Sequence, residues 1–217
     1  MTDDMQAQEA LADLSRLRAI AEEGQRRPLL GGRHLVLWGG VVAVASLLHA
    51  AIVSGTMLVP PIAIAIVWFG LTGAAAVISY SKAFARTKRA RPHDASNSIE
   101  RSIWAVGGAF FGLITVGIFV RAFFTLQLDG DPRLFELFAL MPAITFGVYA
   151  IILRASAEAA KLDQLTLYSW LSLAFVVISV ILIGHIGQFF ATAVGAILVP
   201  VLPGRLLLKL ESDAPHG

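Results

Sequence analysis

The stretch that decides the fold is residues 34–81, HLVLWGGVVAVASLLHAAIVSGTMLVPPIAIAIVWFGLTGAAAVISYS, which places 48 uncharged residues between Arg33 and Lys82. A membrane-spanning α-helix needs about 20 apolar residues, so this stretch is long enough for two crossings and a short turn. Pro60 and Pro61 stand at the start of the second crossing, in the first helical turn, where proline is best tolerated. The stretch therefore predicts an antiparallel pair of transmembrane helices.

The rest of the chain has the same apolar character. Of its 217 residues, 57% are hydrophobic and 15% are charged, whereas soluble domains carry about 25% charged residues. Further uncharged runs cover residues 102–120, 137–153 and 164–204. The chain also has no cysteine, so it contains neither disulfides nor thiolate chemistry. These features exclude a soluble enzyme, a disordered tail and a disulfide-rich scaffold.

The predicted fold class is an all-α integral membrane protein with six transmembrane helices, arranged as three antiparallel hairpins. An amphipathic helix over residues 3–24, with leucines three apart on one face, is expected to precede them. The chain then divides into a cytoplasmic N-terminal helix and hinge (1–33), a transmembrane domain (34–207) and a short cytoplasmic tail (208–217). The six helices are expected at 34–54, 59–81, 102–124, 134–154, 165–184 and 187–207.

The basic residues predict the orientation of the chain. Fifteen of the 17 Lys and Arg residues fall on one side of the predicted helices, and only Arg121 and Arg133 fall on the other. By the positive-inside rule, both termini lie in the cytoplasm, as in a bacterial-type inner-membrane protein. Trp38, Trp104 and Trp170 each begin an odd-numbered helix, where an indole favours the membrane interface. Their equal spacing of 66 residues is either a threefold repeat or chance.

The densest basic patch directly follows the second predicted helix. Anionic lipid headgroups attract such a segment by about 1 kcal/mol for each basic residue near the membrane surface. We therefore expect this patch to contact lipid and not nucleic acid, with fixing of the orientation as its alternative role. A cytoplasmic protein partner is expected, if one binds, on residues 1–24. The basic residues are Lys82, Arg86, Lys88, Arg89 and Arg91.

Small residues recur at spacings that allow close helix packing. Gly108 and Gly112 form a GxxxG pattern, and Gly187, Ala191 and Gly195 form a stripe in the last predicted helix. Small residues let helix backbones approach closely inside a membrane. We expect both faces to pack within the chain, the second one against the helix over 165–184. Dimerisation through these faces is the alternative, and the oligomeric state is left open.

Prolines and histidines inside the predicted helices are candidates for a cavity or a cofactor site. Pro142, Pro200 and Pro203 remove backbone donors and predict kinks, which are either static or act as hinges. His49 and His185 are expected at similar depth on two helices, as a bis-histidine haem site would require. Ordinary interfacial histidines are the alternative, and we expect neither a cofactor nor a metal.

Motifs for catalysis and for coupled transport are missing from the sequence. It contains no HExxH, no GxSxG and no GxxxxGK[ST] pattern. No predicted span has Asp or Glu in its middle, where proton- or ion-coupled transporters need one. The sequence therefore predicts a non-enzymatic inner-membrane protein that acts through protein or lipid contacts. The alternative is a small permease for an apolar or weakly polar solute, with a path along Thr145, Tyr149, Gln188 and Thr192.

Overall fold

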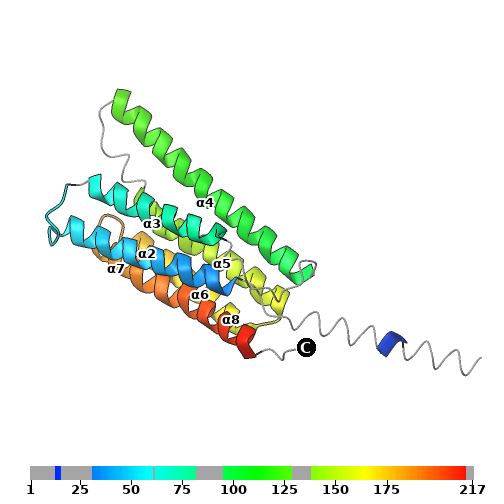
Figure 1. Ribbon diagram of the computed structural model, residues 1–217. Coiled ribbons are helices and arrows are strands. Elements are labelled where there is room, and N and C mark those ends of the chain that lie inside the picture. Colours follow the sequence, from blue (N-terminus) through cyan, green and yellow to red (C-terminus); the bar gives the residue numbers. More distant parts are fainter. Residues whose placement is uncertain (1–12, 16–30, 61, 82–94, 129–137, 214–217) are drawn as a thin grey trace, which may run out of the picture.

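The structure of the chain is a computed structural model. It describes residues 13–15, 31–60, 62–81, 95–128 and 138–213, and all regular elements within these residues are helical (Figure 1). Of the predicted N-terminal helix, only residues 13–15 are described, and they are helical. The remainder of that helix and the basic segment from Lys82 to Arg91 lie outside the described residues, as do Asp129 to Leu137.

Each of the six predicted helices overlaps a helical segment of the structure. The third begins seven residues earlier than expected, and the last continues six residues further, into the predicted tail. The last segment is made of three parts, because a π-helical turn joins two α-helices. The elements are α2 (Gly32–Val53), α3 (Ile62–Tyr80), α4 (Ala95–Leu128), α5 (Met141–Ala160), α6 (Asp163–Ile181), α7 (Gly187–Ala196), η2 (Ile197–Val201) and α8 (Leu202–Asp213).

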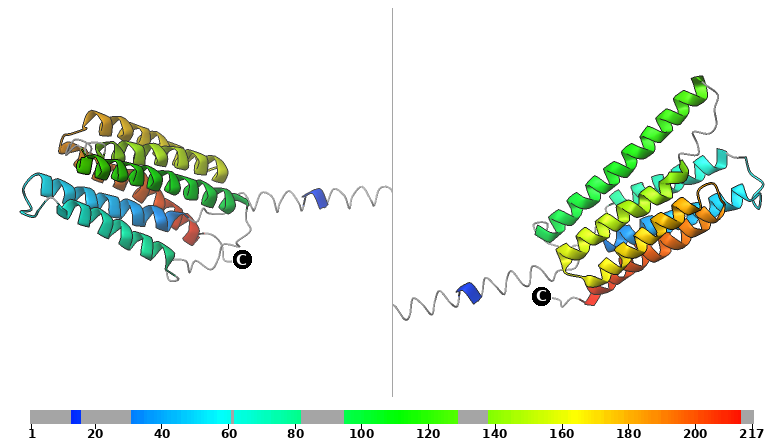
Figure 2. Two further views of the ribbon diagram at one scale, coloured as in Figure 1. Left: turned by 90° about the horizontal axis from the view of Figure 1, so that it is seen from above. Right: turned by 180° about the vertical axis from the view of Figure 1, so that it is seen from behind.

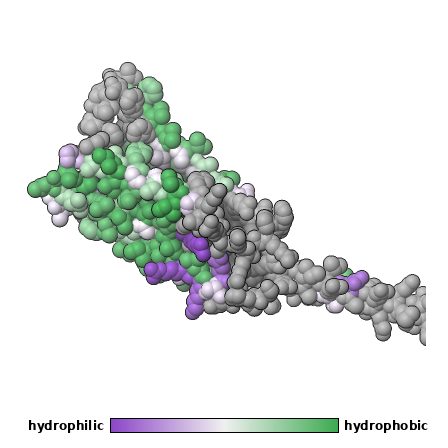
Figure 3. All heavy atoms as spheres, in the orientation of Figure 1, coloured by the Kyte–Doolittle hydropathy of each residue, from purple (hydrophilic) through white to green (hydrophobic). Residues whose placement is uncertain are grey.

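Four helical segments are long and apolar enough to cross a membrane. They are Gly32–Val53, Phe138–Glu158, Asp163–Ile181 and Gly187–Ser212, and two shorter apolar helices cover Ala63–Ser79 and Ser102–Ile118. Apolar residues also cover much of the visible side of the bundle (Figure 3). The chain is thus a helical protein with the apolar helices of a multi-pass membrane protein.

The four long apolar segments form the core of the bundle, and α3 and α4 flank it (Figures 1 and 2). Helix α2 runs antiparallel to α7, η2 and α8, while α5 and α6 form an antiparallel pair. Helix α3 packs on α2, and α4 packs on α5. One buried hydrophobic cluster joins the four core segments and includes Leu35, Phe146, Leu153, Leu165, Phe175, Val199 and Leu207.

The structure differs from the prediction in where Pro142 lies within the fourth helix. Helix α5 begins at Met141, after a 3₁₀ turn over residues 138–140, so Pro142 lies in the first helical turn. Its predicted mid-helix position is wrong. The N–H groups of a first turn have no acceptor within the helix, so proline interrupts no hydrogen bond there.

The prolines of the last segment coincide with a local change of helix type. Pro200 lies inside η2, and Pro203 is the second residue of α8. Because Pro200 has no N–H, it cannot donate the hydrogen bond that a regular α-helix requires at this position. The N–H of Leu202 donates instead to the carbonyl of Ile197, five residues earlier. A π-helical turn thus stands at the position where the sequence predicts a kink.

The three equally spaced tryptophans have different surroundings. Trp104 packs against the core, with its ring edge-on to Tyr149 at a centroid distance of 6.0 Å. Trp170 is 66% exposed on the outer face of α6, and Trp38 is half-buried. The equal sequence spacing therefore does not put these side chains in equivalent packing environments.

Candidate functional site

Buried polar side chains concentrate on the inner faces of α6 and α7. Every third or fourth residue of α6 is buried from Leu165 to Ser179, which is the spacing of one helix face. Serine occupies three of these positions, and Gln188 and Thr192 continue the polar region on α7. We call Ser169, Ser172, Ser179, Gln188 and Thr192 the buried polar seam.

Two serines of the seam bind α6 to α5. The Ser169 hydroxyl donates to the carbonyl of Ala150 at 2.7 Å, and the Ser172 hydroxyl donates to that of Phe146 at 2.6 Å. Small hydroxyl residues let helices approach closely and supply hydrogen bonds between them in an apolar medium. These two bonds hold the α5–α6 pair together along its inner face.

Gln188 joins three segments from a position that is only 1% exposed. Its Nε2 donates to the carbonyl of Ala139 at 2.6 Å and to that of Ser179 at 3.0 Å. Ser179 lies in the last turn of α6, where carbonyls have no donor within the helix. Gln188 therefore supplies a donor that the end of α6 needs and links α7 to the turn that precedes α5.

The four residues of the predicted solute path have partners inside the protein. The Thr145 hydroxyl donates to the Met141 carbonyl at 2.7 Å, and the Thr192 hydroxyl donates to the Gln188 carbonyl at 2.7 Å. Tyr149 packs against Trp104. These contacts are within or between helices, and they give the four side chains a structural role.

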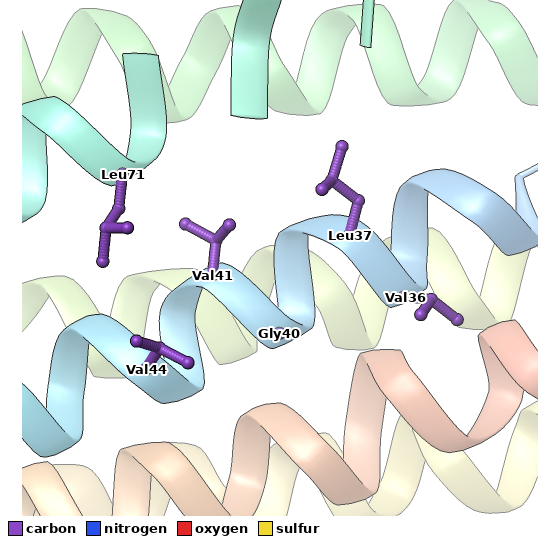
Figure 4. Close-up of a pocket in the computed structure, with 6 residues that line it drawn as sticks. All are labelled: Val36, Leu37, Gly40, Val41, Val44 and Leu71. Atoms are coloured by element: carbon purple, nitrogen blue, oxygen red, sulfur yellow. The ribbon is translucent and has the colours of Figure 1, made fainter. Parts of the chain in front are cut away.

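An apolar groove lies on the outer surface of α2, and the four residues of the predicted solute path are not part of it. It has a volume of about 340 Å³ and runs along α2 beside α3. Gly40 lies between the side chains that form its walls (Figure 4). None of the four path residues lines this groove. Its lining residues are Val36, Leu37, Gly40, Val41, Val44 and Leu71.

The two candidate haem ligands both accept hydrogen bonds through Nδ1. The indole Nε1 of Trp68 donates to His49 at 3.2 Å, and the His49 ring lies against the ring of Phe189 with a centroid distance of 3.8 Å. The backbone N–H of Gly187 donates to His185 at 3.0 Å. His49 thus ties α2 to α3 and α7, and His185 satisfies a backbone donor at the start of α7. These contacts do not test the alternative of a haem-binding role for the pair.

Among the described residues, no group of three or more His, Asp or Glu side chains could hold a metal ion.

Gly195 lies at a close contact between helices. A Cβ atom at this position would lie 2.8 Å from Cδ1 of Phe175 on α6, and it would also collide with the ring of Phe146 on α5. Gly195 therefore contacts the predicted partner helix and a second helix as well. Ala191 is half-buried, and the nearest neighbour of a Cβ at Gly187 would be His185 at 2.9 Å.

The glycines of α4 pack in a different register from the predicted one. A Cβ at Gly108 or Gly112 would meet nothing within 4 Å, whereas a Cβ at Gly107 would lie 2.6 Å from Cδ1 of Ile152 on α5. One residue along a helix turns the side-chain direction by 100°. The described part of the chain therefore packs Gly107 and leaves the GxxxG face without a neighbouring helix.

The contact between α2 and the segment made of α7 and η2 is also close. A Cβ at Gly39 would lie 2.7 Å from Cγ of Pro200 and 2.9 Å from the carbonyl oxygen of Ala196. Ala43 packs nearby against Ala193 and Ala196. Gly39 and Ala43 are small residues four apart, a spacing that favours close helix packing, and the sequence indicates a small-residue face here.

Charged residues gather at the end of the bundle where α2 begins and α8 ends (Figures 1 and 3). Arg154 is held by an ion pair with Glu158 and by a 3.0 Å hydrogen bond to Thr166. Arg121 belongs to the last third of α4, toward the opposite end. Among the described side chains, the exposed basic residues of the first end are Arg33, Arg154, Lys161, Arg205 and Lys209.

Comparison of the sequence with protein-family models, with curated proteins and with solved structures finds no match.

Proposed function

We propose that the chain is a six-helix protein of a bacterial-type inner membrane, built from three hairpins, with both termini in the cytoplasm. The gathering of exposed basic residues at one end of the core supports this orientation, because positive charge favours the cytoplasmic side. The shorter apolar helices α3 and α4 would be the second and third crossings. Their apolar outer faces support contact with lipid.

The proposed activity is binding and not catalysis. The observation that carries this proposal is that four of the five side chains of the buried polar seam donate hydrogen bonds, which connect helices or stay within one helix. Such groups stabilise the bundle, which leaves the cytoplasmic surface for contacts with other molecules. Residues 1–24 would contact a protein partner, and the segment from Lys82 to Arg91 would contact anionic lipid headgroups.

The orientation can be tested with single cysteines, because the natural sequence has none. Thr56→Cys places a thiol in the connection between α2 and α3, and Gln164→Cys places one at the start of α6, where both native side chains are exposed. In intact cells, a membrane-impermeant maleimide should label Thr56→Cys and should not label Gln164→Cys. Both variants should be labelled after the membrane is permeabilised. The reverse pattern would overturn the proposed orientation.

The binding activity can be tested by deleting residues 1–24 from the full chain. The matched control carries the same 24 residues in scrambled order, which keeps length and charge. Proteins crosslinked to the natural chain in native membranes should be lost with the deletion and with the scrambled control. If crosslinked partners, membrane level and growth are the same for all three chains, the proposed role of this segment is wrong.

A further inference from the structure

We propose that the groove along α2 holds one acyl chain of an anionic phospholipid, whose phosphate pairs with Arg33. This inference rests on the proposed membrane location of the chain. It concerns a site distinct from the basic segment over residues 82–91. The site combines an apolar groove with a cation at one end of it.

The groove has the surface that a hydrocarbon chain requires. All six of its lining residues are apolar. Gly40 forms its floor, where a Cβ would meet nothing within 4 Å. Leu71 of α3 bounds one side (Figure 4). On the other side, Val36 reaches toward α8, since a Cβ at Gly204 would lie 2.9 Å from its Cγ2.

The cation lies on the same face of α2 as the groove. Arg33 is exposed, and it precedes Val36 and Leu37 by three and four residues, which puts it one turn away on the same helix face. No acidic residue stands in this first turn of α2. A second exposed cation, Arg205, stands near the same end of α2. It follows Gly204, and the carbonyl oxygen of Gly204 would lie 2.8 Å from a Cβ at Gly32, the residue before Arg33. The two arginines give the end of the groove a positive charge that complements a phosphate.

The size of the groove favours a lipid chain over a protein helix. The residues from Val36 to Val44 span about 12 Å along the helix axis. A helix about 10 Å across would occupy roughly 900 Å³ over that length, whereas the groove offers about 340 Å³. A single acyl chain is narrower, and in a bilayer the phosphate of its lipid lies at the level of the helix ends, where Arg33 stands in the first turn of α2.

The test is native mass spectrometry of the full-length protein with phosphatidylglycerol and phosphatidylcholine of identical acyl chains. Arg33→Gln removes the cation, and Gly40→Leu fills the floor of the groove. The matched controls are Arg121→Gln, at the opposite end of the bundle, and Gly117→Leu, where an added Cβ also meets nothing within 4 Å.

Arg33→Gln should weaken phosphatidylglycerol binding about fivefold, the loss expected for one basic residue near an anionic surface. It should leave phosphatidylcholine binding unchanged. Gly40→Leu should reduce the retention of both lipids, and both controls should behave as the natural chain does. Binding by the two variants that equals the controls would overturn the inference. A change of oligomeric mass in Gly40→Leu would also overturn it, in favour of a second copy as the occupant.

Carbonate extraction of native membranes separates this inference from the proposed function. If carbonate releases the natural chain, the membrane location fails and the lipid site fails with it. If the chain stays in the membrane but binds both lipids equally in all variants, only the lipid site is wrong.

Discussion

Gly32 and Gly204 lie backbone to backbone where α2 and α8 meet. A Cβ on either glycine would come within 2.8 Å of the carbonyl oxygen of the other. Both residues are buried. The approach is possible only because neither residue has a side chain, and it joins α2 to α8 at the charged end of the bundle.

Gly204→Leu should therefore destabilise the folded bundle by about 1–3 kcal/mol, the cost of overpacking a tight interface. The obstacle is the backbone of Gly32, which cannot move aside as the end of a flexible side chain can. Gly40→Ala, on the outer face of the same α2 helix, is the control and should be neutral or slightly stabilising. Thermal unfolding in detergent measures both variants. Equal melting temperatures for Gly204→Leu and the natural chain would contradict the close contact.

The packing of Gly195 can be compared with that of Gly108. Gly195→Leu should also cost about 1–3 kcal/mol, because the new side chain would overlap the rings of Phe146 and Phe175. Gly108→Leu should have little effect on the stability of the monomer, because its Cβ points into open space. Detergent unfolding and sedimentation of both variants test this difference. If Gly108→Leu changes the oligomeric mass, the GxxxG face contacts a second copy.

Gln188→Leu should destabilise the bundle by about 1–3 kcal/mol, since it leaves two carbonyls in an apolar interior without their donor. The affected carbonyls are those of Ala139 and Ser179. Gln164→Leu is the matched control, because Gln164 is exposed at the start of α6. Unfolding in a denaturing detergent compares the two variants. A Gln188→Leu variant as stable as the control would mean that these hydrogen bonds do not hold the three segments together.

Pro142→Ala should change the stability by less than about 1 kcal/mol, because proline in a first helical turn acts mainly by restricting the unfolded chain. Its position after Met141 means that α5 requires no hydrogen bond from the backbone nitrogen of this residue. A mid-helix proline would behave differently, since its replacement restores a backbone hydrogen bond. A clear gain in melting temperature for Pro142→Ala would therefore favour the mid-helix position over the one described.

The sequence by itself determined that the elements are helical and where the six apolar helical segments lie approximately. Long uncharged runs bounded by Arg33, Lys82, Asp163 and Arg205 were sufficient to locate helices, because apolar length is a local property that needs no knowledge of neighbours. The helix end near Pro142 was misplaced, since the proline is compatible with both a kink and a first turn. The helical segment containing Pro200 was located, but not its π-helical turn.

Only the tertiary structure decided which faces meet. The sequence contains small residues on several faces, and a one-residue change of register turns a helix by 100°, which is why Gly107 and not Gly108 packs on α5. Inside a membrane, lipid is as apolar as the core, so hydropathy does not distinguish a packed face from a lipid-facing one. The joining of α2 to α8 and the three-way role of Gln188 depend on contacts between residues far apart in the chain. Such contacts follow from shape and hydrogen bonding in three dimensions, and no local pattern encodes them.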